Sequence, residues 1–133
     1  MTIERIHLSK KAKDDLIKLK RKTGIVNWNI LCRWAFCASL AEPATPSRIK
    51  VPTDSNVEMT WKVFGGSYAD LYFALLKERC RLDGKDVSAA TLAEQFRLHL
   101  HRGIRYLAAD REIKDIAYLI KKGLDQGRTV SGC

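Results

Sequence analysis

The sequence has no apolar run long enough to cross a membrane, and its start lacks the features of a secretion signal. A membrane-spanning helix needs roughly 18 or more apolar residues in a row, and no stretch of the 133 residues approaches that length. The first residues, MTIERIHLSKK, lack the apolar core of a signal peptide. We therefore expect a cytoplasmic protein with no membrane partner.

Paired metal ligands are also missing. The cysteines are widely and irregularly spaced, with no CxxC pair: Cys32, Cys37, Cys80 and Cys133. Structural zinc sites usually take ligands a few residues apart, so we interpret Cys32 and Cys37, on one apolar segment, as buried thiols. His99 and His101 are two residues apart and would not share a face of a helix. We expect no metal and no cofactor.

Motifs that carry chemistry are absent as well. The string Phe64-Gly65-Gly66-Ser67 has neither the GxxxxGK[ST] nor the GxGxxG spacing of a phosphate loop, so we interpret it as a turn. No Ser-His-Asp set, carboxylate pair or two-metal acidic group stands out, although catalytic groups can meet in space from distant positions. The sequence gives no positive evidence for an enzyme, and we expect a non-catalytic protein.

What the sequence does contain is clustered positive charge. Lys and Arg number 24 against 15 Asp and Glu, which gives a net charge of +9. Residues 1–22 carry +5 and residues 97–122 carry +4, whereas residues 42–95 carry −1. Clustered charge of this kind favours a polyanion partner, because neutralising several phosphates together releases many counterions.

The N-terminal third predicts a strand followed by two helices. Residues 2–8, TIERIHL, alternate polar and apolar side chains, as a short half-buried strand does. Ser9 fits an N-cap for a helix over 10–23, and Gly24 fits its end. A second helix over 28–41, with Asn27 as its cap, is apolar almost all round, which suggests that a partner chain covers part of it.

The remaining chain predicts a loop and more helices. A loop runs to about residue 54, residues 57–63 fit either a strand or a short helix, and Ser67 can cap a helix over 68–81 with Leu71, Leu75 and Leu76 on its apolar side. A long helix over 89–109, capped by Ser88, has apolar residues every three or four positions, and Asp110 can cap a last helix over 112–122. We expect a mainly α fold: one helical DNA-binding domain over 1–122 and a flexible tail over 123–133.

The candidate DNA contacts are the basic side chains of the two charged ends. Lysines are flexible point charges that suit phosphates better than base edges. By helical spacing, Lys11, Lys18 and Lys22 share one side of the first helix, and Lys13 and Lys20 share another. The full set of expected DNA-binding residues is Arg5, His7, Lys10, Lys11, Lys13, Lys18, Lys20, Arg21, Lys22, Arg97, Arg102 and Arg105.

The N-terminal half resembles the ribbon-helix-helix family of DNA-binding proteins. It has a short strand, a basic helix, a turn at Gly24 and an apolar second helix. In that family, strands from two chains pair into a ribbon that enters the major groove. The resemblance implies that Arg5 and His7 face outward from the ribbon and that amides near residues 27–29 meet a phosphate. Glu4 and the single arginine of this strand argue against reading of bases, and a strand that only covers a sheet edge is the alternative.

A more specific resemblance covers most of the chain. The segments IERIHLS, NWNILCRWAFCASLAEP, DSNVEMTWKVFGG and FRLHLHRGIRYLA, in that order between Ile3 and Ala108, closely resemble the DndE family of DNA sulfur modification proteins. The resemblance implies a role in the bacterial pathway that replaces a non-bridging phosphate oxygen of DNA with sulfur, while partner proteins mobilise the sulfur. It also implies a compact homotetramer that binds nicked double-stranded DNA through surface lysines.

Three hypotheses follow for the function. The first is a non-catalytic subunit that binds double-stranded DNA, with a nick, for a phosphorothioation complex. The second is a ribbon-helix-helix-like transcriptional regulator that reads an operator. The third is a scaffold whose basic ends bind other proteins of the modification complex.

Overall fold

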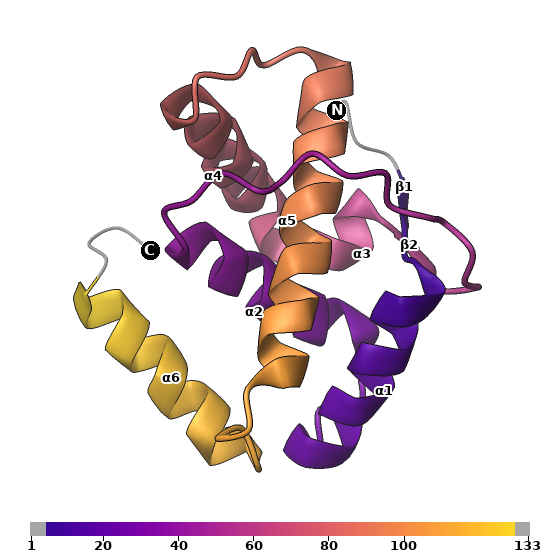
Figure 1. Cartoon of the computed structure of the whole chain (residues 1–133), viewed down its shortest axis with the longest axis vertical. Helices are drawn as coiled ribbons and strands as arrows, with labels where there is room; N and C mark the ends of the chain where they lie inside the picture. The colour runs from indigo at the N-terminus through magenta and orange to yellow at the C-terminus, as the bar shows by residue number, and fades with distance from the viewer. Residues whose placement is uncertain (1–4, 130–133) are drawn as a thin grey trace.

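Helices surround one long central helix in the described part of the chain. The computed structural model describes the backbone of residues 5–129 and the side chains as far as Leu124. Figure 1 shows α5 running through the middle of the molecule, with the other helices around it. This confirms the expected mainly α fold with a short N-terminal strand. The elements are β1 (Arg5–His7), α1 (Lys10–Thr23), α2 (Trp28–Ala41), β2 (Glu58–Thr60), α3 (Trp61–Gly65), the 3₁₀ helix η1 (Gly66–Tyr68), α4 (Ala69–Leu82), α5 (Ala89–Ala109) and α6 (Ile116–Thr129).

Helix α1 begins and ends where its local sequence predicts. The Ser9 hydroxyl oxygen accepts a hydrogen bond of 3.0 Å from the Ala12 amide, which satisfies one of the free N–H groups of the first turn. Gly24 follows the last turn with φ 76°, a left-handed conformation that favours glycine. Leu16 and Leu19 are fully buried, and α1 packs mainly on α5. The predicted bounds of this helix are therefore confirmed.

Helix α2 is buried against its own chain. The largest helix contact joins α2 to α5, and the two backbones approach so closely that a Cβ at Gly103 would lie 1.7 Å from the Ala35 carbonyl oxygen. On the same helix, the ring of Phe36 packs against Phe64 and Phe96, with centroids 5.9 Å and 5.1 Å away. Helices α5 and α3 thus cover much of α2, whereas its remaining side is half-buried and lines a hollow of about 500 Å³. That a partner chain covers part of α2 stays a prediction.

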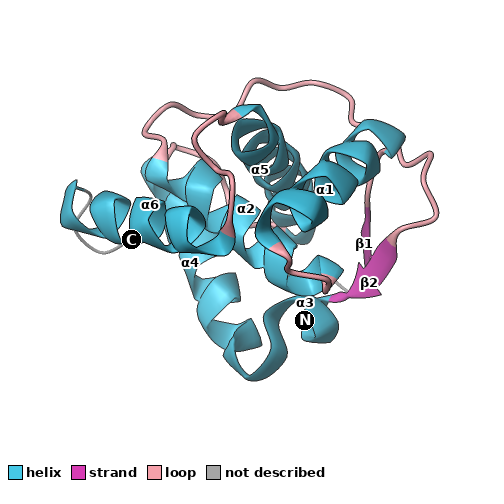
Figure 2. Ribbon diagram, turned by 90° about the horizontal axis from the view of Figure 1, so that it is seen from below, coloured by secondary structure: helices cyan, strands magenta, loops and turns pink. Residues whose placement is uncertain are grey.

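The N-terminal strand pairs within the chain. Strands β1 and β2 form an antiparallel two-stranded sheet in which Ile6 lies opposite Met59. Figure 2 shows this sheet at the edge of the helical body. Residues 57–63, for which strand and helix were both open, contain both: β2 ends at Thr60, whose hydroxyl then caps α3. The sheet thus ties the N-terminus to the segment that precedes α3.

Helix α4 differs from its predicted form at the start. Ser67 lies within η1, and α4 begins two residues later without a side-chain cap. Leu76 is buried as expected, but Leu71 is 54% exposed and does not belong to the apolar side. The Gly65-Gly66 break explains the shift, since Gly66 has φ 57° and redirects the chain between α3 and η1.

The last helix starts later and continues further than predicted. Asp110 accepts a hydrogen bond from the Glu112 amide in a turn, and the Asp115 carboxylate caps α6 by accepting from the Tyr118 amide. The helix continues past Lys122, where the sequence analysis ended the domain. Cys133 lies outside the described residues. Among the helices described between residues 5 and 129, none is both long and apolar enough to span a membrane.

Candidate nucleic-acid interface

Helix α5 exposes one narrow basic stripe. Most of its side chains are buried, whereas Arg97 and Arg105 are exposed and His101 is half-buried between them. These residues are four apart, so they lie on one side of the helix over about 12 Å. The loop between α2 and β2 crosses in front of α5 (Figure 1). The loop passes over the stripe, because Arg97 lines a hollow on one side of it, and His101 and Arg105 line a hollow on the other.

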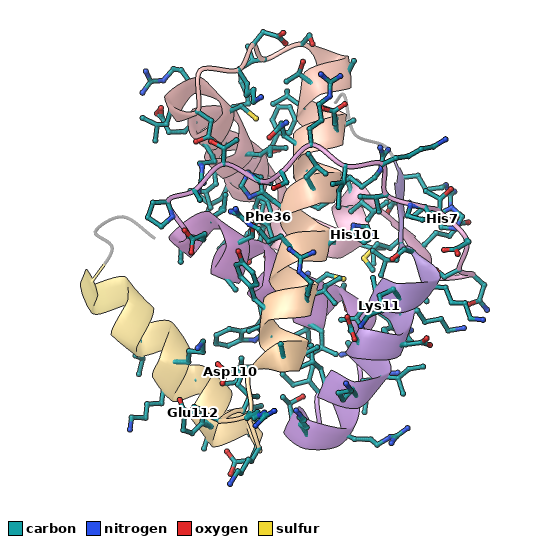
Figure 3. The ribbon with its side chains drawn as sticks, viewed as in Figure 1. His7, Lys11, Phe36, His101, Asp110 and Glu112 are labelled. Carbon is teal, nitrogen blue, oxygen red and sulfur yellow. The ribbon has the colours of Figure 1, made fainter. Side chains whose placement is uncertain are left out.

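His101 joins the stripe to α1. Its Nε2 accepts a hydrogen bond of 3.1 Å from the Ser9 amide, and its Nδ1–H donates to the Arg97 carbonyl oxygen at 2.8 Å. Burial lowers the pKa of this imidazole; the hydrogen bond to the Arg97 carbonyl oxygen opposes this shift, and the charges of Arg97 and Arg105 add to it. Figure 3 shows His101 beside the start of α1, where Lys11 also lies. At neutral pH the ring is therefore uncharged, and it links the start of α1 to α5 through these two hydrogen bonds.

The lysines of α1 divide between two flanks. Lys11, Lys18 and Lys22 share one flank by helical spacing. Lys22, at the C-terminal end of this flank, lies near Asp110, the residue that follows α5. Burial raises the pKa of the Asp110 carboxyl, but hydrogen bonds and the charges of Lys122 and Lys22 lower it overall. Lys11 forms an ion pair of 2.7 Å with the buried Asp15.

The opposite flank of α1 contacts the segment before β2 and the start of α2 instead of α5. Lys13 donates to the Asn56 side-chain oxygen at 2.6 Å, and the Lys20 ammonium lies 4.0 Å from the centroid of the Trp28 ring on α2. Lys10 and Arg21 are exposed on the outermost side, away from α5. The dense lysine cluster of the sequence is therefore not one continuous surface.

The strand residues are occupied by contacts within the chain. Arg5 forms an exposed ion pair of 3.0 Å with Glu58 on β2. The His7 Nε2–H donates to the Ser55 carbonyl oxygen at 2.6 Å. Near the start of α2, the Asn29 side chain donates to the Val63 carbonyl oxygen. Strand β1 thus pairs within its own chain, and Arg5 and His7 both have partners there, which differs from the base-reading ribbon of the ribbon-helix-helix family.

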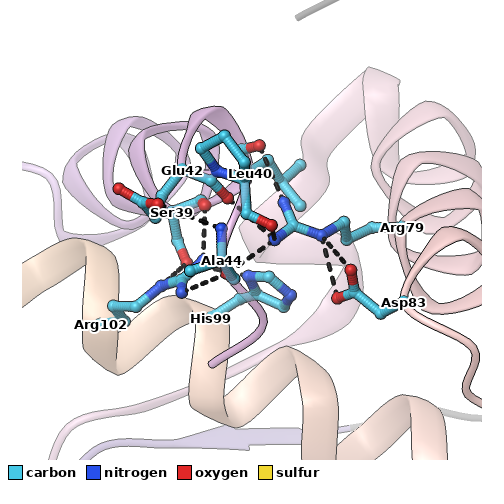
Figure 4. A network of polar contacts seen from close by, with 9 residues as sticks. Ser39, Leu40, Glu42, Ala44, Arg79, Asp83, His99 and Arg102 are labelled. Carbon is cyan, nitrogen blue, oxygen red and sulfur yellow. Dashed lines mark hydrogen bonds and ion pairs between the residues drawn. The ribbon is translucent and has the colours of Figure 1, made fainter. Parts of the chain in front are cut away.

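Arg102 lies in a buried polar network. Its three guanidinium nitrogens donate to the Ser39 hydroxyl, the Ser39 carbonyl oxygen and the Ala44 carbonyl oxygen. Figure 4 shows Arg79 beside it, bonded to Asp83 and also to the Ala44 carbonyl oxygen. His99 is fully buried here, and its burial lowers its pKa to about 4. Arg102 was predicted to bind DNA, but it is buried and each of its three guanidinium nitrogens donates within the chain, so it does not belong to the exposed surface.

Two basic residues that the sequence analysis missed lie on the crossing loop. Arg48 and Lys50, with Glu94, Arg97 and Leu98 of α5, line a hollow of about 500 Å³. Arg48 is 3.7 Å from the Glu94 carboxylate in a solvent-exposed pair, which contributes little to stability. Residues 42–95 are nearly neutral as a segment, so only the path of this loop over α5 could have revealed the pair.

The basic face is the name used below for the cations that these elements bring together. One flank of α1, the stripe of α5 and the crossing loop contribute to it, and all its members are long, flexible or forked donors suited to phosphate oxygens. Its residues are Lys11, Lys18, Lys22, Arg48, Lys50, Arg97 and Arg105.

The described residues include no candidate metal site, and the cysteines Cys32 and Cys80 are buried. No group of three or more His, Cys, Asp or Glu side chains between residues 5 and 124 could hold a metal ion. Cys32 and Cys80 are buried, and burial raises the pKa of Cys32 to about 12. Cys32 is thus protonated at neutral pH and a poor nucleophile.

Comparisons with known proteins agree on one family. A sequence model described as DNA sulphur modification protein DndE matches residues 5–115. A crystal structure of DndE from Escherichia coli B7A, involved in DNA phosphorothioation modification, is 27% identical with a TM-score of 0.68. A crystal structure of a DndE mutant, involved in DNA phosphorothioation, is 23% identical with a TM-score of 0.63 and supports the fold alone. In both cases the alignment covers 80% of this chain and 98% of the other. No curated protein matches the sequence.

Proposed function

Because the chain belongs to the DndE family of DNA sulphur modification proteins, we propose that it is the DNA-binding subunit of a phosphorothioation system. The single observation that carries this proposal is the basic face, to which three separate segments of the chain contribute seven cations. Clustered cations on one surface attract a phosphate backbone from any sequence, because counterion release does not depend on the bases. The proposed partner is double-stranded DNA.

The family membership supports the finer parts of the proposal. We propose that the protein binds DNA at a nick without catalysing a step, while partner proteins of the cytoplasmic modification complex mobilise and transfer the sulfur. We also propose a homotetramer, as the resemblance implies. Helices α5 and α3 cover only part of α2, so this part rests chiefly on the family resemblance.

Salt-dependent binding tests the proposal directly. Fluorescence anisotropy is measured with intact and nicked duplexes of one sequence over a salt series. If all seven cations meet phosphates, the slope of log K against log salt is about −6, since each contact contributes about −0.9. Tighter binding of the nicked duplex supports a nick-holding role. Absence of binding at low salt, or a slope near zero, would refute DNA binding by this protein.

The two alternatives have less support in the geometry. A ribbon-helix-helix regulator needs side chains free to read bases, whereas Arg5 is paired with Glu58 and His7 with Ser55. Selection from randomised duplexes tests it, since a regulator enriches one sequence. A scaffold role is tested by pull-down of the sulfur-transfer partners with and without nuclease, because direct contact between proteins survives nuclease treatment.

A further inference from the structure

A small hollow lies beside Tyr106, on the side of the crossing loop away from Arg97. It has a volume of about 180 Å³, and its lining includes Ile49, Leu98, Arg105 and Tyr106. The Tyr106 side chain is 40% exposed. The guanidinium carbons of Arg102 and Arg105 lie 5.8 Å and 5.7 Å from its ring centroid. A partly exposed aromatic ring with two neighbouring guanidinium groups thus borders a hollow lined by both polar and apolar side chains.

The composition of this hollow suits a nucleobase. Leu98 is buried within the wall, and Ile49 on the loop is 56% exposed at the recess. Exposed aromatic rings with neighbouring cations bind unpaired bases, because every base has a flat π-face and a charged phosphate near it. Arg105 is exposed and available for that phosphate, whereas Arg102 is fixed by its bonds to Ser39 and Ala44.

The position of the hollow fits a strand held by the basic face. His101 lines the hollow and accepts the amide hydrogen of Ser9 at the start of α1. Arg105, one turn further along α5, belongs both to the hollow and to the basic face. Bases inside an intact duplex are stacked and paired, so they cannot enter a recess of this kind, whereas a base without a partner can.

We propose that this hollow binds the base of an unpaired DNA nucleotide, stacked on Tyr106, with the adjoining phosphate on Arg105. The inference rests on the proposed DNA binding by the basic face and adds to it a way of recognising interrupted base pairing. It also gives the crossing loop a role as one wall of the nucleotide site.

The test compares a fully paired duplex with one that carries a single unpaired 2-aminopurine in the same sequence. The full-length protein is expected to bind the second duplex at least about fivefold more tightly, since stacking of one base contributes about 1 kcal/mol or more. Stacking on the ring also quenches the 2-aminopurine fluorescence. In Tyr106→Ala we expect the two affinities to become equal and the quenching to disappear, whereas Tyr106→Phe keeps both.

Two controls separate this site from the basic face and from misfolding. Urea unfolding of Tyr106→Ala checks that the variant is folded, as expected for a half-exposed side chain. Lys18→Ala with Lys22→Ala should weaken both duplexes by the same factor. Equal binding of the two duplexes by the unmodified protein would overturn the nucleotide site but leave DNA binding intact. Failure to bind either duplex would overturn both proposals.

Discussion

The division of α1 into two flanks gives the sharpest test of the basic face. The perturbed variant replaces Lys18 and Lys22 by Ala on the flank beside α5. The matched control replaces Lys13 and Lys20 by Ala on the other flank of the same helix. Both variants lose two positive charges, and alanine favours the helix in each. Lys11 is left in place because its ammonium pairs with the buried Asp15.

The expected loss follows from the number of phosphate contacts. Each contact contributes about 0.9 to the slope of log K against log salt, so losing two of seven changes the slope from about −6 to about −4.5. If the variant and the unmodified protein bind equally at 1 M salt, the variant therefore binds about sixtyfold more weakly at 0.1 M salt. In the control, the lost charges lie across the width of a helix, about 10 Å, which is close to the Debye length at 0.1 M salt. We expect its affinity to fall by no more than about threefold.

Fluorescence anisotropy over a salt series, with one fixed duplex, measures both slopes. Circular dichroism confirms that both variants retain their helices. An equal loss in the two variants would show that binding depends on the total charge and not on the basic face. A larger loss in the control would place the DNA on the flank that carries Lys13 and Lys20, and would refute the basic face as the DNA-binding surface.

Three predictions concern the scaffold beneath this face. Gly103→Ala should destabilise the fold by about 3 kcal/mol or more in urea unfolding, because the new Cβ would meet the Ala35 carbonyl oxygen at 1.7 Å; a loss below about 1 kcal/mol would contradict the close approach of α2 and α5. Arg79→Met should cost about 3–5 kcal/mol, since it strands a buried carboxylate, whereas the exposed Arg81→Ala should cost less than about 1 kcal/mol. Similar losses in the two arginine variants would argue against a buried network. Burial lowers the pKa of His99 from 6.5 to about 4, so the unfolded chain binds more protons between these values and stability falls as the pH decreases through them. We expect a loss of about 2 kcal/mol between pH 7 and pH 5, and a smaller loss in His99→Gln; identical pH dependence in both proteins would assign the effect to other groups.

The sequence predicted best those elements whose signals are local. The helices over 10–23 and 89–109 were predicted with the bounds that the structure has. Each begins at a serine whose hydroxyl accepts an amide hydrogen three residues later, at Ser9 and Ser88. Caps and apolar periodicity depend on residues within one or two turns, so a single sequence contains the information. The start of α6 was missed because two aspartates, Asp110 and Asp115, offered competing caps and only the second begins the helix.

The candidate site was less predictable because it depends on contacts far apart in the chain. Arg102 was expected on the surface with Arg97 and Arg105, but its partners Ser39 and Ala44 lie 63 and 58 positions earlier. No local pattern distinguishes an arginine that binds carbonyl oxygens from one that faces solvent. Net charge per segment had the same weakness, since Arg48 and Lys50 lie in a nearly neutral segment and join the basic face only through the path of the loop.

The buried arginines hold the loop that carries two of the exposed cations. Arg79 and Arg102 both donate to the carbonyl oxygen of Ala44, from α4 and α5 respectively. At the other end of the same loop, the Asp54 side chain accepts the Lys10 amide hydrogen at the start of α1. The loop is therefore fixed at both ends to the helices that border it. Arg48 and Lys50 lie between these anchors, so their charges are held over α5 without direct bonds to its backbone. The buried guanidinium groups of Arg79 and Arg102 thus help to determine where the side chains of Arg48 and Lys50 lie.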